Sequence, residues 1–186
     1  MQPQASATRV QQIGGQVADF ALPGVNGGRT GLTDILDGKR GAVVVFWSGV
    51  CSHCIRYDGY LNAFAERHPE LGLAVIASRS GETPEQIRGT MAEREIVFPI
   101  LHDAGSLVAR QWSTEQTPRA FLFDAGRMLL YRGAIDNFKF PNDPEHAPFL
   151  ETAISEFLAG RAVSRAETSS FGCAIQSVYY TLPKHL

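Results

Sequence analysis

The hydrophobic positions of the chain form short blocks whose spacing changes between strand-like and helix-like patterns. The most apolar block runs from Ala42 to Trp47 without a polar residue. β-Branched and aromatic residues with no polar alternation are typical of a strand covered on both faces, so we expect a central strand here. A second apolar block, from Leu71 to Ala77, predicts another buried strand.

Helix-like spacing fills the segments between these strands. The first such segment follows the central strand and ends before Pro69, which predicts one continuous helix along it. The expected helices cover residues 52–68, 83–91, 107–112 and 148–158. Shorter strands are expected over residues 98–101, 120–123 and 128–131, the last two joined as a hairpin.

The order of these elements predicts the fold class and the domain organisation. Strands that alternate with helices, followed by a hairpin and a last helix, indicate an α/β sandwich with a mixed central sheet flanked by helices. Two short strands around Gly-rich turns precede the central strand. We expect residues 1–13 to form a mobile N-terminal arm, residues 14–160 the domain, and residues 161–186 a C-terminal tail containing Cys173.

Composition and charge exclude several classes of protein. With 186 residues, 44% of them apolar, the chain has the size and composition of one globular domain. Its net charge of -2 creates no positive field to attract nucleic acid. No apolar block approaches the roughly 20 residues that span a bilayer, so no membrane span is expected. We expect a monomer.

The N-terminus bears on the compartment. The first residues are polar and lack the apolar centre of a secretory signal. A cytoplasmic location follows if Met1 is the natural start, and a periplasmic or other extracytoplasmic one if the chain is a trimmed form.

Two of the three cysteines, Cys51 and Cys54, form a Cys-x-x-Cys motif where the central strand turns into the first helix. Free N–H groups and the helix dipole at such a position favour a thiolate. Cysteines so placed often have a pKa of roughly 3.5 to 7.5, compared with about 8.5 for a free thiol. We therefore identify Cys51 as the nucleophile.

Cys54 lies one helical turn further on, about 5 to 6 Å away, which is close enough for a disulfide. The pair can exchange disulfides if Cys51 attacks and Cys54 resolves the mixed disulfide. His53, when protonated, would stabilise the thiolate further and make the disulfide more oxidising.

Metal binding is the competing interpretation. Cys51, Cys54 and Cys173 together would form a soft-metal site for zinc or Cu(I), and the protein would then be a carrier module. A second Cys-x-x-Cys pair, which a structural zinc site would use, is absent from the sequence. Cys173 is also a candidate third redox partner, which a flexible tail would bring to Cys51 as an internal mixed disulfide. We favour the simpler interpretation of Cys173 as a free cysteine buried as a small hydrophobic residue between Phe171 and Ile175.

Four segments carry a resemblance to a known family: residues 15–23, 43–54, 98–103 and 117–124. In this order they resemble the thioredoxin superfamily, in its redoxin (AhpC/TSA-like) branch, which includes TlpA-like thiol-disulfide oxidoreductases. The resemblance covers about residues 14–160. It implies a thioredoxin-like sandwich with an N-terminal β-hairpin extension. It also implies exchange with protein thiols and disulfides, an unidentified redox partner and no cofactor.

The resemblance also implies roles for residues near the cysteine pair. Pro118 would follow a cis peptide bond and face the cysteines, and the backbone of Thr117 would pair with a bound substrate chain. Trp47, four residues before Cys51, is expected at the apolar rim of the sulfur. Asp136 is a further candidate for facing the site.

The chain departs from the family where a proton acceptor is usual. Val45 and Tyr57 occupy the positions at which relatives place a buried acid. Asp58 shares a helix face with the cysteines by spacing and is a candidate acceptor for the Cys54 proton. The simpler interpretation is a solvated Asp58 beside Arg56.

A thiol peroxidase is a lesser alternative, because the redoxin branch includes peroxiredoxins. Their pattern has Pro and Thr at the positions of Val44 and Ser48, so only a hydroxyl remains here.

Overall fold

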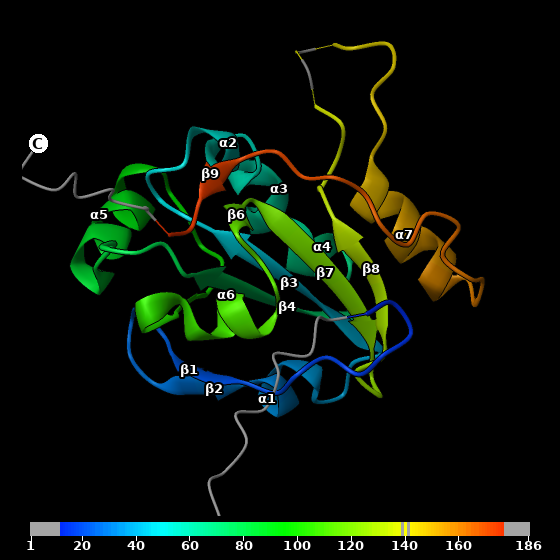
Figure 1. Ribbon diagram of the computed structural model, residues 1–186, viewed down its shortest axis with the longest axis horizontal. Coiled ribbons are helices and arrows are strands. Elements are labelled where there is room, and N and C mark those ends of the chain that lie inside the picture. The colour runs from blue at the N-terminus through cyan, green and yellow to red at the C-terminus, as the bar shows by residue number, and fades with distance from the viewer. Residues whose placement is uncertain (1–11, 139, 141, 177–186) are drawn as a thin grey trace, which may run out of the picture.

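A mixed five-stranded sheet forms the centre of the molecule (Figure 1). The computed structural model describes residues 12–138, 140 and 142–176, so most of the predicted N-terminal arm lies outside the described residues. The strands lie in the order β5 (Ile100–His102), β4 (Leu71–Ala77), β3 (Gly41–Trp47), β7 (Arg119–Asp124) and β8 (Leu129–Gly133). β3, β4 and β5 are parallel, and β7 and β8 are antiparallel to their neighbours, which confirms the predicted α/β class.

The central strand β3 supplies side chains to two separate cores. Successive side chains of a strand point to opposite faces of the sheet, and here both faces are covered. This explains why the whole segment is apolar and fully buried. Val43, Val45 and Trp47 lie in one core, and Ala42, Val44 and Phe46 lie in the other.

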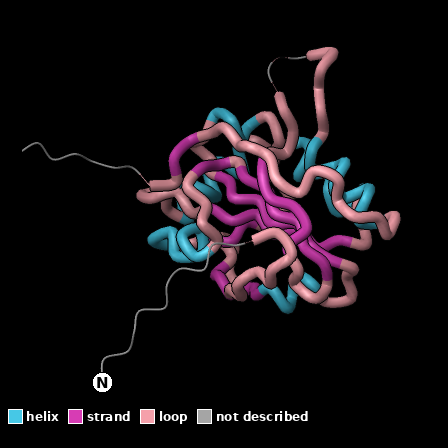
Figure 2. The backbone as a smooth tube through the Cα atoms, turned by 45° about the vertical axis from the view of Figure 1, so that its right-hand side comes forward, coloured by secondary structure: helices cyan, strands magenta, loops and turns pink. Residues whose placement is uncertain are grey.

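Helices cover both faces of the sheet (Figure 2). Beside the core of Trp47 lie α2 (Ser52–Ile55), α3 (Asp58–Asn62), α4 (Phe64–Arg67), α5 (Pro84–Glu93) and α7 (Phe149–Leu158). Beside the other core lie α1 (Leu32–Leu36), α6 (Leu107–Gln111) and the hairpin of β1 (Ala21–Pro23) and β2 (Arg29–Gly31). A 3₁₀ turn, Ala104–Ser106, precedes α6. The expected N-terminal hairpin is thus present.

The prediction of one continuous helix over residues 52–68 is wrong, because the segment is divided into α2, α3 and α4. Hydrogen bonds from Cys54 N–H to Cys51 O and from Tyr57 N–H to Cys54 O span three residues instead of four. Tyr57 and Ala63 have non-ideal backbone angles, and each separates two of the helices. The tighter turn changes which side chains face each other.

The other expected elements appear within a few residues of their predicted bounds. β5 begins at Ile100 instead of residue 98, consistent with Pro99 having no N–H to donate to a strand ladder. At α5, the side chain of Thr83 accepts from Gln86 N–H, and the Gln86 side chain accepts from Thr83 N–H, so a capping box fixes the helix start.

Residues 161–176 run back over the domain. Glu167 pairs with Arg132 alongside β8, and the last strand, β9 (Cys173–Ala174), pairs antiparallel with β6 (Gln116–Thr117). Figure 1 shows β9 beside β6, below α2. The division at residues 13 and 160 stays a prediction. Within the described part of the chain, no helix has the length and apolar character needed to cross a membrane.

Trp112 anchors the second core and provides a test of the packing. Its ring lies 5.1 to 6.1 Å from four phenylalanine rings, measured between centroids, and the side chain is fully buried. Trp112→Ala leaves a cavity, so we expect the free energy of unfolding to fall by about 3 to 5 kcal/mol in urea denaturation.

Val97→Ala is the matched control, because Val97 is 76% exposed. It should change the free energy of unfolding by no more than about 0.5 kcal/mol. Equal effects of the two substitutions would contradict the described core.

Candidate active site

Cys51 lies four residues beyond the end of the central strand, at the residue that precedes α2. Its backbone N–H donates to Ser48 O at 3.2 Å, and its carbonyl accepts from Cys54 N–H at 2.9 Å. These bonds place both sulfur atoms on the inner side of the turn, and neither cysteine has exposed surface. All three cysteines of the chain are free thiols.

Hydrogen bonds to its sulfur lower the pKa of Cys51 to about 4, although burial opposes the shift. The largest contribution comes from the thiol of Cys54, and side-chain hydrogen bonds from Cys173 and Thr117 add to it. When protonated, the Cys51 thiol can donate to the carbonyl oxygen of Thr117 at 3.3 Å, a contact that the thiolate does not make. Cys51 is therefore a thiolate at neutral pH.

The pKa of Cys54 moves in the opposite direction. Burial raises it most, followed by the hydrogen bond to Cys51 and the negative charge of that neighbour. Cys54 thus remains protonated and donates to the thiolate. We expected the dipole of a long helix to favour the thiolate, but α2 has only four residues, and hydrogen bonds are the main cause.

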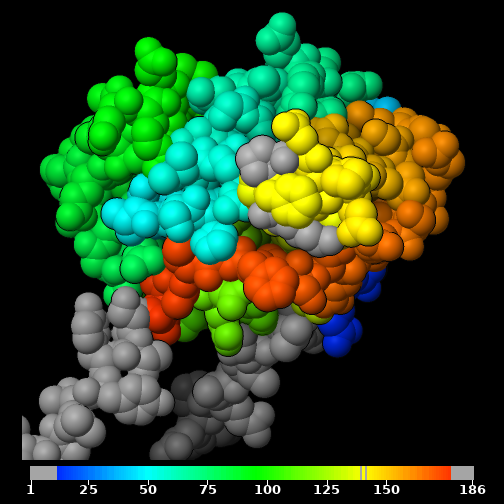
Figure 3. All heavy atoms as spheres, turned by 90° about the horizontal axis from the view of Figure 1, so that it is seen from above, coloured from blue at the N-terminus to red at the C-terminus, as the bar shows by residue number. Residues whose placement is uncertain are grey.

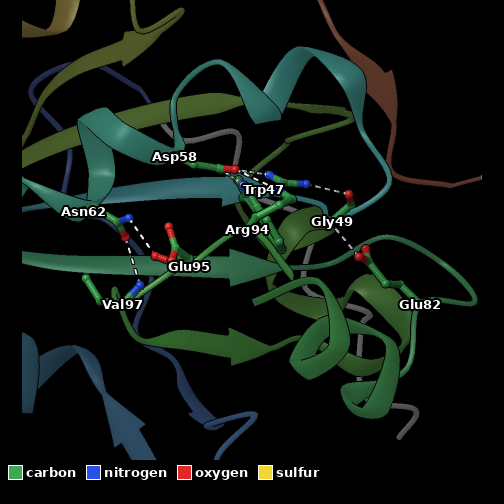
Figure 4. Close-up of polar contacts among 8 residues, drawn as sticks. All are labelled: Trp47, Gly49, Asp58, Asn62, Glu82, Arg94, Glu95 and Val97. Atoms are coloured by element: carbon green, nitrogen blue, oxygen red, sulfur yellow. Dashed lines mark hydrogen bonds and ion pairs between the residues drawn. The ribbon is translucent and has the colours of Figure 1, made fainter. Parts of the chain in front are cut away.

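The turn before Cys51 is held from both sides at Gly49 (Figure 4). Its N–H donates to Glu82 Oε1 at 2.7 Å, and its carbonyl accepts from Arg94 Nη1 at 2.8 Å. A Cβ at this position would lie 2.8 Å from Glu82 Oε1 and 2.9 Å from Thr90 Oγ1, which is too close. A larger residue where the chain leaves β3 would therefore displace the side-chain ends of Glu82 and Thr90.

Arg94 connects this turn to Asp58. Its Nε donates to Asp58 Oδ2 at 2.7 Å, and Trp47 Nε1 donates to Asp58 Oδ1 at 3.3 Å. The interpretation of Asp58 as a solvated residue beside Arg56 is wrong, because the side chain is buried and ion-paired. The break between α2 and α3 directs Asp58 toward Arg94. Its expected role as acceptor of the Cys54 proton stays a prediction.

The remaining predicted site residues lie on two sides of the cysteines. Trp47 is fully buried in the same apolar core as the two cysteines, and its expected part in the apolar rim around the sulfur stays a prediction. On the other side, the Thr117–Pro118 peptide bond is cis. The backbone of Thr117 pairs with Cys173 of β9, and Cys173 is a free thiol that is half-buried against the core rather than fully buried.

A cleft of about 680 Å³ opens beside Pro118 and His53. Tyr57 and Asp136 also line it, and the Tyr57 hydroxyl donates to Asp136 Oδ1 at 2.6 Å. Burial is the largest cause that raises the pKa of Tyr57, and the hydrogen bond to the Asp136 carboxylate adds to it. The candidate Asp136 thus faces the cleft, beside the cysteine pair.

Glu82 and Arg94 were missed by the sequence analysis. Both lie more than 30 residues from Gly49 along the chain, as the contacts from Gly49 to Glu82 and Arg94 show. No local motif marks them. Among the described residues, no group of three or more His, Cys, Asp or Glu side chains is arranged to hold a metal ion, so the structure gives the metal-site alternative no support.

Comparison with known proteins agrees with this geometry. Residues 13–132 match the model of the AhpC/TSA family. The chain belongs to the AhpC/TSA family. The matched region includes the hairpin, the cysteine pair, Thr117 and Pro118.

Individual members and solved structures extend the comparison. The thiol-disulfide oxidoreductase ResA of Bacillus cereus is 28% identical over 113 residues, which cover 61% of this chain and 64% of that relative. The match therefore spans just under two thirds of the relative. A hypothetical protein, SMc02350 from Sinorhizobium meliloti 1021, has a solved structure that is 28% identical with a TM-score of 0.78, covering 88% of this chain and 93% of that one.

The fold of this AhpC/TSA member is thioredoxin-like. The thioredoxin domain of the thiol-disulfide oxidoreductase BVU-2223 from Bacteroides vulgatus superposes with a TM-score of 0.56 at 17% identity, over 65% of this chain and 87% of that domain. At this identity the likeness concerns the fold alone.

The ion pair behind the active-site turn is testable by substitution. Arg94→Gln leaves the Asp58 carboxylate buried without its cation and Gly49 O without its donor. We expect the free energy of unfolding of the reduced protein to fall by about 3 kcal/mol in urea.

Arg127→Gln serves as the control, since the pair of Arg127 with Asp19 is 3.5 Å long and exposed on both sides. Its effect should stay within about 0.5 kcal/mol. If Arg94→Gln were equally mild, the turn would not depend on this network.

Proposed function

We propose that this protein is a thiol-disulfide oxidoreductase that exchanges disulfides with protein substrates. The observation that carries the proposal is the tight turn after the central strand, which buries Cys51 and Cys54 together; there the pKa of Cys51 is lowered and that of Cys54 is raised. One sulfur is thereby a ready nucleophile, and the other retains its proton until it is needed. Membership of the AhpC/TSA family and the similarity to ResA support the assignment.

In the first step the Cys51 thiolate attacks one sulfur of a substrate disulfide. A bond forms between Cys51 and that sulfur, the substrate S–S bond breaks, and the second substrate sulfur leaves as a thiolate that takes up a proton. The negative charge on Cys51 is lost here, so Cys54 no longer faces a thiolate. The negative charge of Cys51, which helps to raise the pKa of Cys54, is therefore absent from this point on.

In the second step Cys54 gives up its proton and attacks the Cys51 sulfur. The Cys51–Cys54 disulfide forms and the substrate leaves as a thiol, so the substrate gains two electrons and the enzyme loses two. The two electrons pass directly from the enzyme sulfurs to the substrate sulfurs, and the step needs no bound cofactor. A separate redox partner reduces the enzyme disulfide again, and the same steps in reverse oxidise a substrate dithiol.

The cleft beside the cysteines is suited to a polypeptide. It is lined by apolar rings, including Phe138 and Phe149, and by the cations Arg56 and Arg165. It adjoins Pro118 and His53, so a bound side chain would lie next to the Cys-x-x-Cys turn. His53 is half-buried at this edge, where it contacts both the cleft and the active-site turn.

Reduction of insulin disulfides by dithiothreitol tests the proposal. The wild-type protein should accelerate the reaction, and Cys51→Ser should return it to the uncatalysed rate because the nucleophile is lost. Cys54→Ser/Cys173→Ser should still attack, and after mixing with insulin in the absence of dithiothreitol, mass spectrometry should detect the accumulated mixed disulfide between Cys51 and a substrate cysteine. Val97→Ala, a surface substitution far from the motif, should retain wild-type activity.

Two other outcomes identify the competing functions. Rapid consumption of hydrogen peroxide without insulin reduction would indicate a thiol peroxidase. Stoichiometric retention of zinc or Cu(I) without insulin reduction would indicate a metal carrier.

A further inference from the structure

The predicted nucleophile has no surface that a substrate can reach. Cys51 is fully buried, although its chemistry requires contact with another sulfur atom. The segment that covers it comes from the far end of the described chain. In Figure 3 the orange-red residues near 170 cross the face directly beside the cyan residues near 50.

This segment is attached as a β-strand. In the β6–β9 ladder, Thr117 is paired with Cys173 and Gln116 with Ala174. Directly after β9, Ile175 N–H donates to Glu115 O at 2.9 Å, its carbonyl accepts from Ser80 N–H at 2.8 Å, and its side chain is buried in the second core. The segment therefore occupies a defined position over the cysteines.

Gly172 permits the close approach of the strand. A Cβ at this residue would lie 1.8 Å from the carbonyl oxygen of Thr117 and 2.5 Å from its carbonyl carbon. Because both are backbone atoms, they cannot move aside as a flexible side chain does. Any larger residue at position 172 would push β9 away from β6.

The register brings a third sulfur to the Cys51 sulfur. The Cys51 sulfur lies 3.3 Å from the carbonyl oxygen of Thr117, the residue that pairs with Cys173, and hydrogen bonding to Cys173 helps to lower the pKa of Cys51. Burial and the proximity of Cys51 raise the pKa of Cys173, so at neutral pH it is a donor to the thiolate. Cys51 thus contacts two thiols, one from α2 and one from β9.

We propose that Cys173 is a third redox-active cysteine, which forms an intramolecular disulfide with Cys51. Cys173 lies beside the backbone of Thr117, in the position that a substrate sulfur would take. This role of Cys173 rests on the proposed function in one respect only: both use Cys51 as the nucleophile. β9 then acts as an internal competitor of the substrate, because an external sulfur reaches Cys51 only where β9 has been displaced.

The exchange needs no further oxidant once Cys51 and Cys54 are joined. Cys173 gives up its proton and attacks the Cys51 sulfur, the Cys51–Cys173 bond forms, and the Cys51–Cys54 bond breaks. Cys54 leaves as a thiolate and takes up a proton, so the number of disulfides and of protons is unchanged. The reverse attack by Cys54 releases Cys173, and the oxidised enzyme is a mixture of the two disulfides.

The test uses the full chain carrying Cys54→Ser and the oxidant dithiobis(nitrobenzoate). Cys51 attacks the reagent and releases one thionitrobenzoate, and Cys173 then attacks the Cys51 sulfur and releases the second. We expect two equivalents of released dye, no dye left on the protein, and a Cys51–Cys173 disulfide in the peptide map. The matched variant Cys54→Ser/Cys173→Ser should release one equivalent and retain one adduct on Cys51.

Adducts retained separately on Cys51 and Cys173 would overturn the proposal.

Gly172→Ala in the Cys54→Ser background gives a second test that leaves both reacting cysteines in place. Displacing β9 should slow release of the second dye molecule by roughly a hundredfold, the effect of a misplacement of about 1 Å. Gly89→Ala, where a Cβ meets no atom within 4 Å, should leave that rate unchanged, and equal rates for the two glycine variants would contradict the role of β9.

Insulin reduction by the wild-type protein separates this proposal from the function. Insulin reduction without the Cys51–Cys173 disulfide would overturn the role of Cys173 and leave the proposed function intact. Formation of the disulfide without insulin reduction would overturn the proposed function and support the role of Cys173.

Discussion

The chemistry of this protein depends on one hydrogen bond, from the thiol of Cys54 to the sulfur of Cys51. In water such a bond would contribute little, but here both sulfurs are buried and the donor cannot be replaced by solvent. The bond is the largest cause of the lowered pKa of Cys51, and it also helps to raise the pKa of Cys54. A single contact therefore assigns the nucleophile and the resolving thiol.

The rest of the fold keeps these two sulfurs in place. The parallel strands end at the same edge of the sheet. The chain leaves β3 through a glycine whose N–H is held by the buried Glu82 and whose carbonyl is held by the half-buried Arg94. Arg94 is itself fixed by Asp58, which also accepts from Trp47 in the core. On the opposite side, β9 closes the site with a third thiol. The site is thus rigid below the cysteines, whereas its cover is a strand of two residues.

The local sequence pattern was sufficient to predict the sheet and the Cys-x-x-Cys motif, but not the contacts between segments that are distant in the sequence. The apolar block of β3 was predictable because burial on both faces leaves no polar positions. Cys51 and Cys54 were predictable because only two residues separate them, which places both on one turn. The break in the helix over residues 52–68 was not predictable. The tight turn at Tyr57 allows Tyr57 and Asp58 to contact distant residues, and the spacing of apolar residues gives no sign of these contacts. The pairing of Cys173 with Thr117 spans 56 residues, and no periodicity in the tail marks its partner.

The most direct test of this account is a pH titration of thiolate ultraviolet absorbance in the reduced protein, with Cys51→Ser as the reference. Because the pKa of Cys51 is lowered to about 4, one thiolate should appear with a midpoint near pH 4 and be missing from the variant. Near-ultraviolet circular dichroism should show that the protein remains folded across this range. A first thiolate that appears only near the pKa of a free cysteine, about 8.5, would contradict the account.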